Sequence, residues 1–492
     1  MQSLQSVTPA QPAASGTRRR WAALVVLAAI EFMILLDASI VNIALPAIKS
    51  SLHFSELDLA WVPNAYMLVF GGLLLFGGRA ADLLGRRRFY LLGLALFTVS
   101  SLLAGLAPTA MALLLARALQ GAGAALVLPA EQSLLVTIFT DPKEFNRAFG
   151  VWGAMAAAGG VFGLLLGGAL TQLTGWPWVF LINVPIGALA LLVSPRLLPE
   201  SRAAEPGQRL DIPGALSVTL AILALAYAPI AGQQSGWDSL PALGALGLGA
   251  ALLIAFLVIE ARTPSPLVPL RLFRNRDTNG ANLVSFLIGA AHAPMFYLLS
   301  LYFQQALGYS ALQTALAVLP IGAGALLISL LLIPPLLRHL GWRGVLAVGM
   351  LALAVGLALF ARAPIPSVYA ADILPASLLV AFGLPAAMVG SNIAAVSAVT
   401  KAETGLASGM MNTAQRVGGG IGVATLTALF ASFAGPLTTS VGPGALSAGF
   451  HAAFIAAAAL ALLGAILTLA IIRRPTAQPD ADAAPHGFHF HH

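Results

Sequence analysis

Residues 18–46 read RRRWAALVVLAAIEFMILLDASIVNIALP, in which three arginines precede an apolar run of 26 residues. A helix that crosses a hydrocarbon core of about 30 Å needs about 20 residues, so this run can span a membrane. A secretory signal has a shorter apolar region and a small-residue cleavage site before a soluble domain. We therefore predict that residues 21–46 form the first membrane-spanning helix.

The whole chain has the composition of a membrane protein. Of its 492 residues, 59% are hydrophobic and 9% are charged, whereas soluble domains carry about 25% charged residues. Such a chain cannot cover itself with a water-compatible surface, so we expect the lipid bilayer to be a partner. The net charge of +7 does not indicate nucleic-acid binding, because the basic residues stand in short loops between apolar runs.

Apolar runs and their breaks predict fourteen spans. They lie near 21–46, 57–77, 89–107, 109–138, 148–171, 177–195, 212–232, 240–260, 278–304, 311–336, 343–361, 366–398, 404–432 and 446–472. Short cytoplasmic loops are rich in Lys and Arg. If both termini lie inside, the 25 Lys and Arg residues fall in cytoplasmic segments with four exceptions. Lys49 and Arg362 lie outside, and Arg117 and Arg416 lie within spans. The sequence therefore predicts an all-α polytopic membrane protein.

Two polar, proline-rich segments divide the spans into six, two and six. We predict a cytoplasmic N-terminal tail (1–20), a six-helix bundle (21–195), a linker region with two extra helices (196–277), a second six-helix bundle (278–472) and a cytoplasmic tail (473–492). The last seven residues, HGFHFHH, are expected to be a solvated tail and not a metal site. Repeated six-helix halves place a transporter's central site near the bilayer midplane.

Four segments carry recognisable motifs. They are LLDASIVNIALP (Leu35–Pro46), GRAADLLGRRR (Gly78–Arg88), LLLARALQGAGAA (Leu113–Ala125) and WPWVFLINVPIG (Trp176–Gly187). Together they resemble the major facilitator superfamily, and within it the fourteen-span drug:proton antiporter family. The resemblance implies a facilitator fold of two six-helix bundles plus two extra central helices. It also implies a monomer in the bacterial inner membrane, driven by the proton gradient and needing no cofactor.

The fifth span matches the family's antiporter motif in part, through Gly159, Gly163, Gly167 and Gly168. Gly160 and Leu164 stand where the family usually has proline. Glycines four residues apart form one smooth helix face that permits close backbone approach. We therefore predict a sliding contact near the boundary between the two halves.

Asp37, Glu131 and Arg117 stand deep inside the predicted spans of the first bundle. A charge at the membrane centre costs several kcal/mol unless it is paired, protonated or facing water. We predict that Asp37 faces a water-accessible cavity and carries the coupling proton; the alternative is a packing carboxylate hydrogen-bonded to a neighbour. Arg117 is permanently charged and is predicted to pair with Asp37 or Glu131, unless it only fastens its helix to others. Competition between a proton and a cationic substrate for one carboxylate is sufficient for exchange.

Glu31 lies six residues before Asp37, about 120° away around the helix. The two carboxylates therefore do not share a face. Glu31 is predicted either to line the cytoplasmic vestibule, as a further proton-coupling residue, or to be paired.

The loop after the second span is predicted to gate the cytoplasmic side through Gly78, Asp82, Gly85, Arg86 and Arg88. Asp82 is suited to hold the positive N-terminal end of a neighbouring helix, and the arginines to pair with acids across the two halves. The alternative is that the arginines serve only topology.

Polar residues within the spans suggest a substrate cavity lined by Asn42, Gln120, His292, Tyr297 and Arg416. For His292 and Tyr297, helix packing is the alternative. The chain shows no phosphate loop, metal-ligand helix or nucleophile elbow, so it is not predicted to be an enzyme.

The sequence thus predicts a proton-driven exporter of hydrophobic, cationic small molecules that works by alternating access. Three alternatives stay open. Two keep the fold, as a dedicated exporter of one endogenous metabolite or a proton symporter. The third is a membrane sensor or lipid-modifying enzyme that does not transport.

Overall fold

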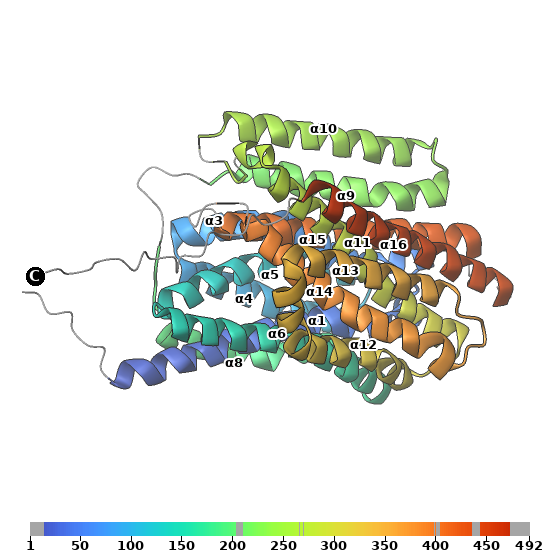
Figure 1. Ribbon diagram of the computed structural model, residues 1–492, viewed down its shortest axis with the longest axis horizontal. Helices are drawn as coiled ribbons and strands as arrows, with labels where there is room; N and C mark the ends of the chain where they lie inside the picture. The colour runs from blue at the N-terminus through green and yellow to red at the C-terminus, as the bar shows by residue number, and fades with distance from the viewer. Residues whose placement is uncertain are drawn as a thin grey trace, which may run out of the picture.

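A computed structural model shows a helical protein and describes residues 14–202, 210–264, 266–268, 270–397, 399, 404–434 and 443–472. Within these ranges fourteen helical segments are long and apolar enough to cross a membrane, which confirms the predicted number of spans. Most of these helices run alongside one another down the long axis of the molecule (Figure 1). The histidine-rich tail lies outside the described residues.

The first half of the chain forms one group of spanning helices. They are α1 (Ala14–Leu52), α3 (Trp61–Leu84), α4 (Arg86–Gly105), α5 (Ala110–Ile138), α6 (Pro142–Leu173) and α8 (Asn183–Leu197), with the short α2 (Glu56–Leu59) and α7 (Trp178–Leu181) between them. The predicted break between the third and fourth spans is confirmed, because α4 ends at Gly105 and the Thr109 side chain accepts a hydrogen bond from the backbone of Ala112 at the start of α5. Such a cap satisfies a backbone donor that the helix leaves free.

The second half forms the corresponding group. It contains α11 (Arg276–Leu301), α12 (Ala311–Leu331), α13 (Ile333–Ala361), α14 (Leu374–Ser397), α15 (Thr404–Ala434) and α16 (Pro443–Ile471). Short π-helical turns, η2 (Tyr302–Ala306) and η3 (Tyr369–Ile373), flank α11 and α14, and a 3-10 turn, η1 (Leu270–Arg274), precedes α11.

The two extra helices, α9 (Ile212–Ser235) and α10 (Leu240–Arg262), form a pair along one edge of the molecule (Figure 1). The helix α9 packs on the bundles. Its Ile222 shares an apolar cluster with Leu68 of α3 and Val417 of α15, so α9 touches both halves. The close approach of Thr219 to Gly72 of α3 leaves no room for a side chain at that glycine. The hairpin therefore covers the seam between α3 and α15.

The glycine face of α6 packs inside the first half. A Cβ added at Gly159 would collide with the carbonyl oxygen of Phe32, and one at Gly163 with Ser39, both on α1. Gly167 meets the Ile40 carbonyl in the same way. Of the four motif glycines, Gly168 alone meets the other half, at Ala315 of α12. The predicted close packing is confirmed, but its predicted place at the boundary between the halves is wrong for three of the four.

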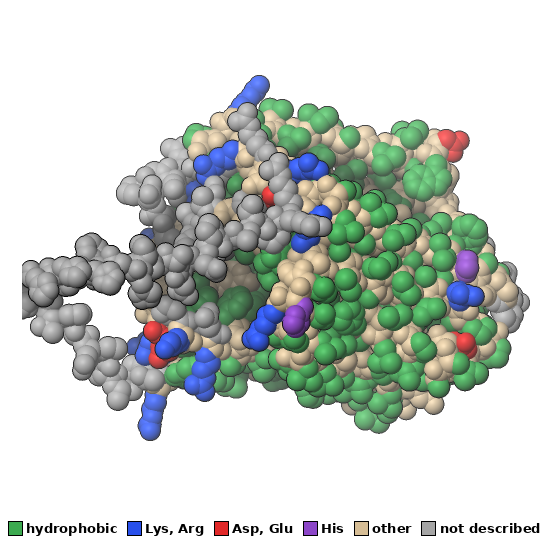
Figure 2. Space-filling model, in the orientation of Figure 1, with side chains coloured by type: hydrophobic (Ala, Val, Ile, Leu, Met, Phe, Trp, Pro, Cys, Tyr) green, Lys and Arg blue, Asp and Glu red, His purple; other side chains and the backbone are tan. Residues whose placement is uncertain are grey.

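Apolar side chains cover most of the surface between the two ends of the molecule (Figure 2). Large residues such as Leu192, Leu331 and Ile254 are more than half exposed. Most of the Lys and Arg side chains visible on this face gather toward the left of the view (Figure 2). An apolar middle with charged ends is the surface that a bilayer requires, and the chain is a multi-pass membrane protein.

Candidate functional site

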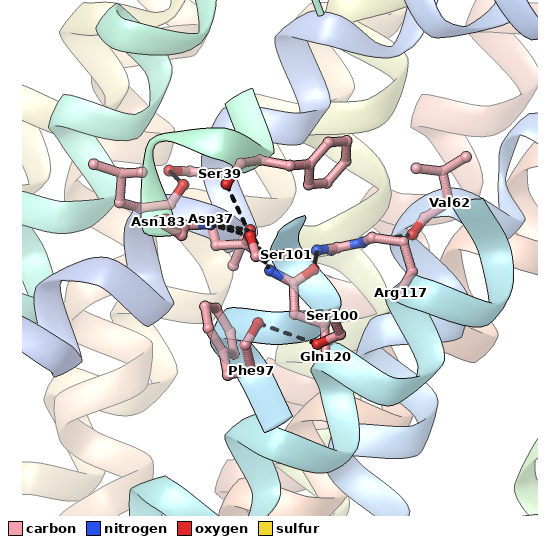
Figure 3. Close-up of polar contacts among 12 residues, drawn as sticks. Asp37, Ser39, Val62, Phe97, Ser100, Ser101, Arg117, Gln120 and Asn183 are labelled. Atoms are coloured by element: carbon pink, nitrogen blue, oxygen red, sulfur yellow. Dashed lines mark hydrogen bonds and ion pairs between the residues drawn. The ribbon is translucent and has the colours of Figure 1, made fainter. Parts of the chain in front are cut away.

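Asp37 of α1 lies at the centre of a buried polar network in the first half (Figure 3). Its Oδ2 accepts a hydrogen bond from Nη1 of Arg117 on α5 at 2.6 Å, which is also an ion pair. Its Oδ1 accepts from the side-chain amides of Gln120 and Asn183, each at 2.8 Å. The side chains of Asp37 and Arg117 are 0% and 1% exposed. The carboxylate is therefore fully bonded and removed from solvent.

Arg117 makes further contacts inside the same network. Its Nη1 also donates to Gln120 Oε1 at 2.6 Å, and its Nε donates to the backbone carbonyl of Val62 on α3 at 3.2 Å. The guanidinium carbon lies 4.3 Å from the ring centroid of Tyr66, a cation–π contact. A buried ion pair is tolerated only when further hydrogen bonds satisfy both partners, and here they do.

The sequence predicted the pairing of Asp37 with Arg117, and the structure has it. The prediction that Asp37 faces a water-accessible cavity is wrong for this conformation. The structure matches the alternative, in which the carboxylate is bonded between helices. Gln120, predicted to line a substrate cavity, is also fully buried in this network.

Two members of the network were missed by the sequence reasoning. Ser101 of α4 accepts hydrogen bonds from Gln120 and Asn183 and donates one to the Phe180 carbonyl at 2.9 Å. Asn183 begins α8 and lies within the motif Trp176–Gly187, in which the sequence predicted no role for this residue. An amide inside an apolar motif was the available signal.

Glu31 and Glu131 form a second buried cluster. Glu31 of α1 is 4% exposed and Glu131 of α5 is 0% exposed. The two carboxylates interact electrostatically with each other. Within the described part of the chain, both oxygens of Glu131 and Oε2 of Glu31 have no hydrogen-bond partner. We call Glu31, Glu131, Trp152 and Arg416 the Glu31–Glu131 cluster.

The other two members of the cluster come from different parts of the fold. Trp152 of α6 lies beside Glu131, yet its indole Nε1 is buried and outside hydrogen-bonding geometry. Arg416 belongs to α15 of the second half and contacts the first half. Its Cζ lies 3.8 Å from the ring centroid of Phe70 on α3. The Arg416 guanidinium also attracts the Glu31 carboxylate electrostatically. No ion pair joins Arg416 to Glu31 among the described residues. The cluster therefore bridges the two halves.

The loop between α3 and α4 makes its contacts within the first half and the linker. Arg86 pairs with Asp82 at 2.9 Å and donates to Thr137 of α5 at 2.8 Å. Arg88 lies 3.8 Å from a carboxylate oxygen of Glu200, which follows α8. Among the residues that the structure describes, the predicted ion pairs across the halves are not formed, and Asp82 bonds Arg86 and not a helix end.

The glycines of that loop have separate geometric reasons. Gly85 has a φ of +124°, a conformation that L side chains rarely adopt, and the Glu200 carboxylate fills the space where a Cβ would lie. Gly78 faces Pro129 of α5 at an ordinary contact distance of 3.4 Å. The turn between α3 and α4 thus depends on Gly85.

The remaining cavity candidates are dispersed. Asn42 donates to the Ala38 carbonyl of its own helix at 3.1 Å. His292 makes an edge-on ring contact with Phe296, with centroids 5.3 Å apart. Tyr297 is 0% exposed in the apolar core, which is the packing alternative foreseen for it. Of the predicted cavity residues, Arg416 is brought to the junction of the two halves.

Comparison with known proteins decides the family. The family model described as Major Facilitator Superfamily matches residues 27–423. The chain belongs to the Major Facilitator Superfamily. Solved structures show the same fold: a POT family transporter in complex with a thioalcohol-conjugated peptide superposes with a TM-score of 0.69 at 14% identity, covering 91% of this chain and 96% of that one.

Curated relatives of this superfamily member are similar over nearly their whole length. The puromycin resistance protein pur8 of Streptomyces alboniger is 39% identical, covering 94% of this chain and 93% of the relative. The cephamycin export protein CmcT of Amycolatopsis lactamdurans is 38% identical, with 92% and 93% covered. The lincomycin resistance protein of Streptomyces lincolnensis is 39% identical, with 86% and 87% covered. The chain is accordingly a transporter and not an enzyme.

Proposed function

We propose that this chain exports hydrophobic, cationic small molecules across the bacterial inner membrane, with both termini in the cytoplasm, in exchange for protons that enter the cell. Support for export comes from relatives named for antibiotic export or resistance that align over most of both chains. The two six-helix groups, which touch across α6 and α12 and across α3 and α15, are suited to alternate access by rocking against each other.

One observation carries the proton coupling. The first half buries three carboxylates within its spans, Glu31, Asp37 and Glu131. Among the residues that the structure describes, Asp37 alone of the three is bonded to an arginine. An ionised carboxylate in the membrane interior is costly unless a counter-charge joins it. A proton supplies that counter-charge in one state and a cationic substrate in another, so the two exchange.

The proton gradient is large enough to drive such export. A proton that enters while a monovalent cation leaves moves no net charge, so the membrane potential does no net work and the pH difference drives the exchange. At about 1.4 kcal/mol for each factor of ten, a difference of one pH unit supports a substrate gradient of about tenfold.

The test is transport in everted membrane vesicles that contain this protein, with ethidium and other lipophilic monocations as probes. When respiration acidifies the vesicle lumen, the dyes are expected to accumulate, and an ionophore that collapses the pH gradient is expected to release them. Vesicles without the protein are the control. If no member of a broad panel moves when the pH gradient is imposed, the proposal is wrong.

The direction of movement separates exchange from symport. Symport is the alternative that α6 supports, because α6 continues unbroken from Pro142 to Leu173 and has Gly160 and Leu164 where the family's prolines stand. A symporter would drive dye out of an acidic lumen together with protons. Accumulation in the acidic lumen therefore contradicts symport.

A further inference from the structure

The two halves of the chain repeat one loop after their second spanning helix. In the first half the loop reads DLLGRRR (Asp82–Arg88), and in the second half it reads RHLGWR (Arg338–Arg343). Each contains a glycine with a positive φ, +124° at Gly85 and +66° at Gly341, and Gly341 interrupts the helical geometry of α13. A helix follows each glycine, so the residues after the two glycines occupy corresponding places.

The arginines two residues after these glycines bind the end of the sixth spanning helix of their own half. Arg87 Nη1 donates to the carbonyls of Pro195 and Leu198 at the end of α8, at 3.3 and 3.2 Å. Arg343 Nη2 donates to the carbonyl of Leu469 near the end of α16, at 2.5 Å. The carbonyl end of a helix attracts positive charge, and both halves use it in the same way.

A second arginine repeats the arrangement. Arg19 of α1 donates to the Arg196 carbonyl of α8, and Arg276 of α11 donates to the Ala470 carbonyl of α16, each at 2.8 Å. The helices α1 and α11 are the first spanning helices of their halves. Each half therefore brings two guanidinium groups to the same helix end.

The first half balances these arginines with a carboxylate, whereas the second half does not. The Glu200 carboxylate lies 3.7 Å from Nε of Arg87 and accepts a hydrogen bond from the backbone N–H of Arg87 at 3.2 Å. Its Oε1 lies 2.9 Å from a Cβ built at Gly85. A Cβ built at Gly341 meets nothing within 4 Å, and Nε of Arg343 is buried without a partner among the described residues. No described side chain of the second half thus takes the place that Glu200 takes in the first.

The sequence near the end of α16 does not supply the corresponding acid. Residues 473–479 read RRPTAQP, and the first acid after the helix is Asp480. The second loop has the exposed Arg338 where the first loop has Asp82. Asp277 at the start of α11 already has a partner. Positive charge that the first half neutralises with its own side chains therefore accumulates at the end of α16.

The surface beside Arg343 suits a lipid better than a free anion. Leu469, whose carbonyl bonds Arg343, has a side chain that is 56% exposed, and Leu340, next to Gly341, is 49% exposed. An acyl chain can cover these apolar side chains, whereas a free anion cannot. Basic pockets between spanning helices near the membrane surface bind anionic lipid headgroups.

We propose that the phosphate of an anionic phospholipid binds beside Arg343 and Arg276 at the end of α16, in the place that corresponds to the Glu200 carboxylate, with an acyl chain along Leu340 and Leu469. The lipid supplies the counter-charge that the chain itself supplies in the first half. With both termini inside, as proposed above, it belongs to the cytoplasmic leaflet. The site depends on neither the direction nor the driving force of transport.

The experiment is native mass spectrometry of the purified full-length protein in detergent, titrated with phosphatidylglycerol or with phosphatidylcholine of the same acyl chains. The wild type is expected to bind phosphatidylglycerol at least about fivefold more tightly, the contribution of one basic residue at a membrane surface. Arg343→Gln is expected to lose this preference. Arg87→Gln is the matched control and is expected to keep it, because Glu200 already balances Arg87.

A second variant tests the correspondence between the halves through a gain of binding. Glu200→Gln removes the carboxylate from the first half, so this variant is expected to bind a second phosphatidylglycerol with an affinity similar to that of the first. Unfolding cannot produce such a gain, so the variant decides the question even if Arg343→Gln does not fold. No additional lipid on Glu200→Gln would overturn the proposal.

The remaining outcomes distinguish other occupants of the site. Displacement of the lipid by an equal concentration of glycerol 3-phosphate would assign a free anion and overturn the lipid. Weak binding to the wild type that becomes strong in the double variant Asp480→Asn, Asp482→Asn would assign the chain's own tail. An equal loss of preference in Arg343→Gln and Arg87→Gln would mean a general attraction to basic surface. The vesicle assay tests export separately, so none of these results decides the proposed function.

Discussion

The Asp37 network and the Glu31–Glu131 cluster place buried carboxylates of the first half in opposite situations. Asp37 has an arginine and two amides on its carboxylate and is fully buried. Glu131, equally buried, has no hydrogen bond to either oxygen among the described residues. A carboxylate in a membrane span is therefore not by itself evidence of proton exchange. The balance of charge and hydrogen bonds around it distinguishes a helix fastener from an exchange site.

The largest expected effect comes from removing the counter-charge of the balanced network. Arg117→Ala leaves the Asp37 carboxylate buried without its ion pair, which typically costs about 3–5 kcal/mol. Thermal unfolding of the purified protein in detergent is expected to show a strong loss of stability. Arg88→Ala removes a largely exposed arginine at a loop and is the control, with an expected change of at most about 1 kcal/mol. Equal stability of the two variants would contradict the account of the Asp37 network.

The same chemical change is expected to have different effects in the two clusters. Asp37→Asn strands the Arg117 guanidinium and is expected to destabilise the fold by about 3–5 kcal/mol. Glu131→Gln removes a carboxylate that has no bonded partner and is expected to change stability by less than about 1 kcal/mol, because a neutral amide costs less to bury than an ionised carboxylate. Unfolding temperatures of both variants at one pH measure the difference. A large loss in Glu131→Gln and a small one in Asp37→Asn would reverse the comparison.

A smaller effect is expected from the packing of α6 on α1, on which Glu31 and Asp37 both depend for their positions. Gly163→Ala places a methyl group against Ser39 and the Leu36 carbonyl, and overpacking of this kind costs about 1–3 kcal/mol. Gly160→Ala, three residues earlier on the same helix, meets nothing within 4 Å and is the matched control. The difference between the two unfolding temperatures checks the contact. No difference would mean that α6 does not pack on α1 through this face.

Most of the fold could be predicted from the sequence, because a bilayer imposes a one-dimensional rule. Each span needs about 20 apolar residues in a row and basic residues at alternating ends. The break at Ala107–Thr109 shows how well this works: Pro108 and a Thr cap interrupt an otherwise continuous apolar run, and the structure ends one helix and begins another there. The glycine spacing of α6 likewise predicted a face, though not which helix would lie against it.

The site could be predicted only where the information is local. Helix geometry placed Glu31 and Asp37 on different faces, and in the structure they belong to different clusters. The partners of these two acids could not be predicted in this way. Asn183 and Glu131 lie far from α1 in sequence, and no periodicity links them to that helix. The pairing of Arg88 with Glu200 was missed because the segment after α8 has no repeating pattern that fixes where its acid falls. Which buried carboxylate remains unbonded is decided by three-dimensional packing alone.

The most direct measurement of the central claim is infrared difference spectroscopy of the purified protein with and without tetraphenylphosphonium. The account predicts that the cation removes the carbonyl stretch of a protonated carboxylic acid, and that this change is absent in Glu131→Gln. A wild-type-like loss of that band in Glu131→Gln and in Glu31→Gln would contradict the account, because the exchanging proton would then belong to a carboxyl outside the Glu31–Glu131 cluster.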